Sequence, residues 1–151
     1  MDALRDDRYT GALATFCRRK GKRFMSTIHQ EATFSAPPSR IYKVLTDLKE
    51  FSEATGAPAS GEATEGSAFT AFGGHITGRH LELVPDRRVV QGWRAKTWPE
   101  GIYSIVRFEL RPDGGGTKLV FDQEAFPEGE KEHLAGGWTK MYWENISKHV
   151  G

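Results

Sequence analysis

The stretch HLAGGWTKMYWENISKHV, residues 133–150, decides the fold. Two adjacent glycines, Gly136 and Gly137, fall inside it, and each costs up to about 1 kcal/mol relative to alanine in a helix interior. Two interpretations stay open: the glycines let the helix approach the sheet closely or bend, or the helix begins after Gly137. The apolar side chains recur at the spacing of one helical stripe, formed by Leu134, Trp138, Met141, Tyr142, Ile146 and Val150.

An amphipathic helix of this kind needs an apolar surface to cover, and the preceding segments supply one. Between residues 67 and 126, alternating segments are separated by short turns rich in Gly, Pro and Asp, which predicts consecutive antiparallel hairpins. On residues 88–98 the alternation places Trp98 on the polar face. The apolar face carries Val89, Gln91, Trp93, Ala95, Thr97, Val106, Phe108, Leu110, Leu119, Phe121, Gln123 and Ala125.

The segment before these hairpins predicts one strand followed by two short helices. TIHQEATFSA, residues 27–36, alternates like a strand, and apolar residues in 36–47 recur at helical spacing. A second short helix over residues 49–56 ends at Gly56. The fold class is therefore α+β, with a curved antiparallel sheet wrapped around a long C-terminal helix and two short helices after the first strand.

Composition limits the classes of partner. The 151 residues suit one domain, and 21 Lys+Arg against 20 Asp+Glu argue against nucleic acid as a partner. No apolar run approaches the length of a membrane span. The single cysteine, Cys17, excludes an intrachain disulfide and favours a cytoplasmic location.

The first 25 residues lack the pattern of the rest. They end in the basic cluster RRKGKR, residues 18–23, and we expect a disordered extension, with the domain covering residues 26–151. A start codon placed too early, with Met25 as the true start, and a functional basic arm are the alternatives.

The sequence predicts no catalytic residue, metal site or cofactor, and a non-enzymatic role is favoured. The serine-hydrolase elbow and the His-Glu and Cys-pair metal motifs are absent. His75 and His80 lie at an odd spacing on one predicted strand, which favours a solvated or half-buried pair on opposite faces. His133 beside Glu130 and Glu132 fits the complementation of a helix dipole.

The order of these elements resembles the helix-grip fold of the START-like (SRPBCC) superfamily. The segments QGWRAKTW, residues 91–98, and GGWTKMYW, residues 136–143, are similar to the domain at the C-terminus of the activator of heat-shock protein 90 ATPase. The resemblance covers roughly residues 26–151. It implies a cavity between sheet and helix, ligand-binding, cyclase-like or chaperone-activating relatives, and a link to the stress response. We expect no N-terminal chaperone-binding domain ahead of Met25, which argues against ATPase activation.

Three functions follow from these observations. The first is a non-enzymatic domain that binds a small hydrophobic or amphipathic molecule between sheet and helix, with a filled core as the alternative to an open cavity. The second is a chaperone-associated protein-binding module, and the third is a cyclase- or hydrolase-like enzyme using Glu82, His80 or Tyr142. The predicted cavity lining is Phe69, Gln91, Trp93, Phe108, Phe121, Gln123, Trp138, Met141 and Tyr142.

Overall fold

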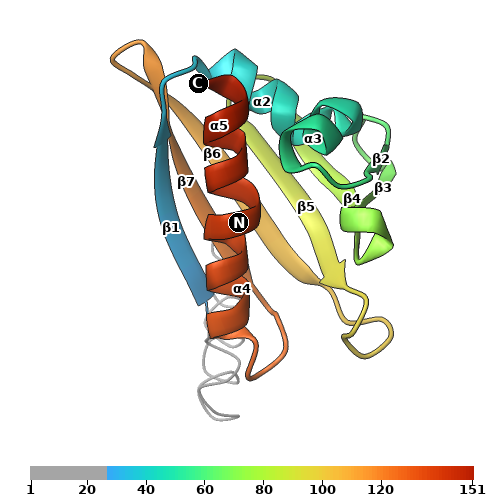
Figure 1. Cartoon of the computed structure of the whole chain (residues 1–151). Coiled ribbons are helices and arrows are strands. Elements are labelled where there is room, and N and C mark those ends of the chain that lie inside the picture. The colour runs from blue at the N-terminus through green and yellow to red at the C-terminus, as the bar shows by residue number, and fades with distance from the viewer. Residues whose placement is uncertain (1–26) are drawn as a thin grey trace, which may run out of the picture.

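One seven-stranded antiparallel sheet wraps around the C-terminal helix in this computed structural model, which describes residues 27–151 (Figure 1). The strand order is β1-β7-β6-β5-β4-β3-β2. This confirms the predicted α+β helix-grip architecture. The strands are β1 (Thr27–Phe34), β2 (Ser60–Gly61), β3 (Ala68–Ala71), β4 (Ile76–Val84), β5 (Arg88–Ala95), β6 (Ser104–Asp113) and β7 (Gly116–Glu124).

The predicted N-terminal extension, including Cys17 and the basic cluster at residues 18–23, lies outside the described residues. Every helix in the described part of the chain is too short or too polar to cross a membrane.

Two short helices follow β1, as predicted, and lie at one end of the sheet (Figure 1). They are α2 (Pro38–Thr46) and α3 (Leu48–Thr55). The Asp47 carboxylate caps α3 by accepting hydrogen bonds from the backbone N–H groups of Lys49 and Glu50, at 3.0 and 3.3 Å. Gly56 ends α3 in the left-handed conformation, with φ 76°.

The closing helix is continuous from Lys131 to Val150 and changes type in its middle. It consists of α4 (Lys131–Gly137), a π-helical turn η3 (Trp138–Trp143) and α5 (Glu144–Val150). Gly136 and Gly137 therefore lie inside the helix, and the interpretation that it begins after Gly137 is wrong. No neighbouring atom would lie within 4 Å of a Cβ at either glycine, so close packing against the sheet does not explain them.

The π-helical turn changes which side chains of the helix are buried. Trp138, Tyr142 and Trp143 are all buried, although the predicted stripe omitted Trp143. Met141, which the stripe included, is 42% exposed. The wider turn brings two successive aromatic rings, at 142 and 143, onto the face that meets the sheet, and regular helical spacing does not predict that.

An aromatic cluster with a buried hydrogen-bond chain joins this helix to the sheet. The ring of Trp138 lies 4.2 Å from that of Phe121 and 4.1 Å from that of Tyr142, measured between centroids. Trp138 Nε1 donates a hydrogen bond to Gln123 Oε1 at 2.8 Å, and Gln123 Nε2 donates to Ser104 Oγ at 3.0 Å. Around Trp138 the core is thus apolar, with the polar atoms of Trp138, Gln123 and Ser104 paired.

A second pair of hydrogen bonds joins the closing helix to β1, and the sequence did not predict it. Trp143 Nε1 donates to Gln30 Oε1 at 2.7 Å, and Gln30 Nε2 donates to the carbonyl of Ala135 at 3.0 Å. One glutamine of β1 therefore satisfies a buried indole and a helix carbonyl together.

The predicted facing of the sheet is confirmed along β6, β7 and most of β5, with an error at the end of β5. Trp98 was assigned to the polar face, yet it is only 5% exposed. The strand stops at Ala95, and a turn in which the Trp98 N–H donates to the Ala95 carbonyl at 3.0 Å returns the indole to Trp93. Thr97 and Ala125, predicted on the apolar face, are exposed because both lie beyond the strand ends.

We expect Trp138→Ala to lower the free energy of unfolding by about 3–5 kcal/mol, because it opens a cavity and leaves Gln123 Oε1 unpaired. Urea denaturation followed by circular dichroism measures this. Met141→Ala, in the same helix but half exposed, is the control and should cost far less. A loss below about 1 kcal/mol at Trp138 would contradict the described packing.

Candidate ligand-binding cleft

A cleft of about 380 Å³ opens between the start of the closing helix and the adjoining ends of β4 and β5. Its size lies within the range of small-molecule sites, and most of its lining is apolar. The lining residues are Phe72, His75, Ile76, Trp93, Ala95, Thr97, Glu130, His133, Leu134, Gly137, Trp138, Met141 and Tyr142.

The inner wall of the cleft is apolar, and its polar atoms are already hydrogen-bonded. Trp93 Nε1 donates to the Tyr142 hydroxyl at 3.3 Å, and Trp138 Nε1 is held by Gln123. Burial raises the pKa of the Tyr142 phenol far above its ordinary value, so the phenol stays protonated and neutral. The inner wall consists of the buried side chains of Ile76, Trp93, Ala95, Leu134, Trp138 and Tyr142.

The mouth of the cleft, in contrast, is polar. It is formed by His75, Thr97, Glu130 and His133, of which Glu130 is half-buried and the others are exposed. Within the described part of the chain, no hydrogen bond or ion pair engages these four side chains. The cleft therefore has an apolar inner end and a polar outer end.

The structure distributes the predicted lining residues over three environments. Trp93, Trp138, Met141 and Tyr142 line the cleft. Phe69, Gln91 and Phe108 border a separate void of about 10 Å³ beside Tyr142, room for one water molecule at most. Phe121 and Gln123 border neither space and are fully buried. Both sequence interpretations thus describe part of the interior, since it is filled around Phe121 and open beyond Tyr142.

Several cleft residues were not identified from the sequence as lining. Ile76 lies in a segment whose alternation predicted a strand. Glu130, His133 and Gly137, at the start of the closing helix, reach the cleft only through tertiary folding. Gly137 could have been found from its cost in helix propensity, because a tolerated helical glycine needs a reason. The structure offers that reason: a side chain at Gly137 would project into the cleft.

The residues proposed for acid or base chemistry do not form one site. Glu82 forms an ion pair with Arg88, with Oε1 3.0 Å from Nε. His80 is fully buried and stacks on Phe69, with ring centroids 5.1 Å apart. The prediction of a solvated or half-buried histidine pair on one strand is therefore wrong for His80, and His75 precedes β4.

His80 is an unusual buried group. Neither ring nitrogen has a hydrogen-bond partner among the described residues, and burial lowers its pKa. A register shift between His80 and Glu82 on β4 marks a β-bulge beside it. Burial without a hydrogen-bond partner therefore favours the neutral form of this imidazole in the folded protein.

We expect the free energy of unfolding to fall as the pH drops below about 6.5. In that range the His80 imidazole binds a proton in the unfolded chain more readily than in the folded protein. The His80 contribution is at most about 1.4 kcal/mol per pH unit and stops growing below its folded pKa. Urea denaturation between pH 5 and 8 should show a shallower decline for His80→Leu than for the parent.

His29→Gln supplies a control of opposite sign. The hydrogen bond to Asp122, at 2.7 Å, raises the pKa of His29, so its stabilisation is present at low pH and is lost as the pH rises. Removing it should abolish a gain in stability that the parent shows as the pH falls from the raised pKa of His29 towards about 6.5, and should leave the slope below about pH 6.5 unchanged. If His80→Leu leaves the parent's pH dependence unchanged, the account of His80 is wrong.

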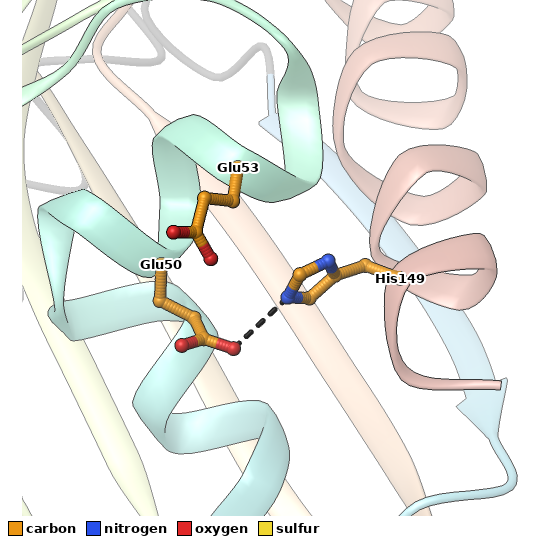
Figure 2. Close-up of side chains that lie close together, drawn as sticks. All are labelled: Glu50, Glu53 and His149. Atoms are coloured by element: carbon orange, nitrogen blue, oxygen red, sulfur yellow. Dashed lines mark hydrogen bonds and ion pairs between the residues drawn. The ribbon is translucent and has the colours of Figure 1, made fainter.

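A second polar cluster lies at the opposite end of the closing helix (Figure 2). Glu50 and Glu53 of α3 face His149 of α5, with His149 Nε2 2.9 Å from Glu50 Oε2. Their spacing resembles that of metal ligands, but the same Glu50 oxygen also accepts a hydrogen bond from Arg40 of α2. The bonds to His149 and then Arg40 lower the pKa of Glu50. Through its bonds to Arg40 and His149, Glu50 therefore links α2, α3 and α5.

Comparison with known proteins gives a consistent set of relatives. The family model described as Activator of Hsp90 ATPase homolog 1-like protein matches residues 35–151. The human Activator of 90 kDa heat shock protein ATPase homolog 1 is 33% identical over 119 residues, 79% of this chain and 35% of that protein. The Saccharomyces cerevisiae Hsp90 co-chaperone AHA1 is 24% identical over 132 residues, 83% and 38% of the two chains. The chain thus spans about a third of the length of these relatives.

The solved structures agree with this result. The crystal structure of an HSP90 activator from Plasmodium falciparum has a TM-score of 0.74 and 25% identity, covering 80% of this chain and 92% of that one. CalU16 from Micromonospora echinospora, with a TM-score of 0.70 and 22% identity over 83% of this chain and 76% of its own, shares the fold.

Proposed function

This chain belongs to the Activator of Hsp90 ATPase homolog 1-like family, and from the cleft beside its closing helix we propose that it binds a small hydrophobic or amphipathic molecule without transforming it. The observation that carries the proposal is the combination of an apolar, aromatic inner wall with an open mouth. An aromatic wall of this kind buries much apolar ligand surface for little loss of side-chain entropy.

The position of Gly137 supports this proposal further. A glycine in a helix interior lowers helix stability, yet here it leaves space free beside Trp138. Replacing it by a larger residue should improve helix propensity and fill the cleft, so binding and stability should change in opposite directions.

We expect Gly137→Leu to weaken binding of the neutral fluorescent probe N-phenyl-1-naphthylamine at least tenfold while the protein stays as stable as the parent or becomes more stable. Gly136→Leu is the matched control, because it gains the same helix propensity at a residue that does not line the cleft. Fluorescence titration and thermal melting measure both effects. Equal binding by the two variants, or no binding by the parent, would overturn the cleft proposal.

A chaperone-associated role is the second candidate, and the relatives named as Hsp90 activators favour it. An exposed apolar row crosses the face of the sheet turned away from the helix. Leu81 Cδ1 would lie 3.9 Å from a Cβ on Gly92, and Ile105 pairs with Gly92 across β5 and β6. Leu81, Tyr103 and Ile105 are each between 44 and 50% exposed. Exposed apolar groups gathered in this way are typical of protein-binding surfaces.

This candidate adds a partner and a location. An Hsp90-type ATPase is the partner it proposes, with a role in the stress response and a cytoplasmic location. Activation of the partner's ATPase is a separate step, because the chain covers only about a third of the length of the activators.

We expect Ile105→Asp to weaken binding to purified Hsp90 about tenfold or more, because it replaces one of the exposed apolar side chains of this row by a charge. Thr33→Asp, an exposed position on β1, adds the same charge as a control and should leave binding intact. Surface plasmon resonance with ATP or ADP present measures affinity, and a steady-state ATPase assay measures activation. Parent protein that shows no binding at tens of micromolar would exclude this candidate.

A further inference from the structure

We propose that the ligand of this cleft is an apolar molecule with a single cationic end, an aliphatic amine above all, which lies at the mouth against Glu130. The inference rests on the proposed ligand-binding function and assigns the chemical class and the orientation of the ligand. It follows from the uneven distribution of free hydrogen-bonding groups between the two ends of the cleft.

The inner end of the cleft has one polar group left to offer, the hydroxyl proton of Tyr142, whose oxygen already accepts from Trp93 Nε1. The indole N–H groups of Trp93 and Trp138 are both donated to protein acceptors, at 3.3 and 2.8 Å. The chain of bonds continues from Gln123 to Ser104, whose hydroxyl donates to the Trp93 carbonyl at 2.8 Å. A polar ligand atom placed elsewhere on this wall would lose its water without gaining a partner, at a cost that disfavours it. The inner part of the ligand is therefore apolar, with at most one acceptor atom facing Tyr142.

The mouth has the opposite character, and its charge is negative. Among the residues that line the cleft, Glu130 is the single carboxylate, and none is a lysine or an arginine. Glu130 is anchored, because its backbone N–H donates to the Pro127 carbonyl and its carbonyl accepts from the Leu134 N–H at 2.9 Å. Its carboxylate makes no bond to another described residue, so it stays available to a ligand.

The neighbouring sequence strengthens the preference for a cation. In the sequence, Lys131 and Glu132 follow Glu130, so the start of the closing helix carries more negative than positive charge. An anionic head group would meet this excess of negative charge with no basic residue in the lining, whereas an ammonium group would be attracted. The imidazoles of His75 and His133 and the hydroxyl of Thr97 complete the polar ring.

The volume limits the length of the apolar part. A space of about 380 Å³ lies near the lower end of the range of small-molecule sites. A saturated chain of medium length suits it, so decylamine, decanol and decanoic acid form a matched probe series that differs only in the polar end.

The test is competition of these three probes against N-phenyl-1-naphthylamine on the full chain at pH 7.5, below their aggregation concentrations. We expect decylamine to bind about fivefold more tightly than decanol, the size of a partly exposed charge pair, and decanoate to bind most weakly. The advantage of the amine should shrink as sodium chloride is raised from 50 to 500 mM.

Variants locate the effect. Glu130→Gln should abolish the advantage of decylamine over decanol, so that the ratio of the two affinities falls to about one. Glu132→Gln, two residues away and outside the cleft lining, removes the same charge nearby and should keep most of the advantage. An amine preference that survives in Glu130→Gln would overturn the assignment of Glu130.

The remaining outcomes separate this inference from the function on which it rests. If all three probes bind equally, or decanoate binds best, the cleft binds ligands and the cationic end is wrong. If neither the fluorophore nor any of the three binds the parent, the proposed ligand-binding function itself fails and this inference fails with it.

Discussion

The structure depends on the requirement that the Trp138 indole be buried against the sheet with its N–H satisfied. Gln123 of β7 meets this requirement by accepting from the indole, and its own amide is held by Ser104 of β6. Because one glutamine reaches both the helix and the neighbouring strand, it fixes the rotation and the height of the helix over the sheet. Leaving either polar group unpaired inside this core would cost about 1–3 kcal/mol, so alternative placements of the helix are disfavoured.

The cleft is a consequence of how the helix distributes its volume. The aromatic side chains that fill the core are concentrated between Trp138 and Trp143, where the π-helical turn brings two successive rings onto the sheet. The preceding turn carries Gly136 and Gly137 instead, so the helix covers the ends of β4 and β5 without filling the space above them. An open end and a packed middle of one helix thus arise from the same eight residues, 136–143.

Sequence reasoning predicted the fold and four of the residues that line the cleft, because both depend on local periodicity. The alternation of β5, β6 and β7 placed Trp93, Phe121 and Gln123 correctly on the inner face. Strand alternation gave the wrong face for Trp98, where a turn reverses the chain. Helical spacing gave the wrong burial for Met141 and Trp143, because a π-helical turn breaks the 3.6-residue period. The burial of His80 was not predicted, because it depends on a bulge beside His80 and on a stacking partner in β3. Glu130 and His133 meet His75 only through tertiary folding, which no local pattern records.

The two candidate functions use opposite faces of the same strand and are physically compatible. On β5, the side chain of Trp93 lines the cleft, whereas the preceding Gly92 lies on the outer face beneath Leu81 and beside Ile105. Alternation along a strand separates these faces by a single residue, so a substitution on one face leaves the side chains of the other in place. A ligand that filled the cleft would pack against Trp93 and Trp138 and tighten the joint between β5 and the closing helix, without covering the row around Ile105. The two proposed functions therefore do not compete for the same surface of the protein.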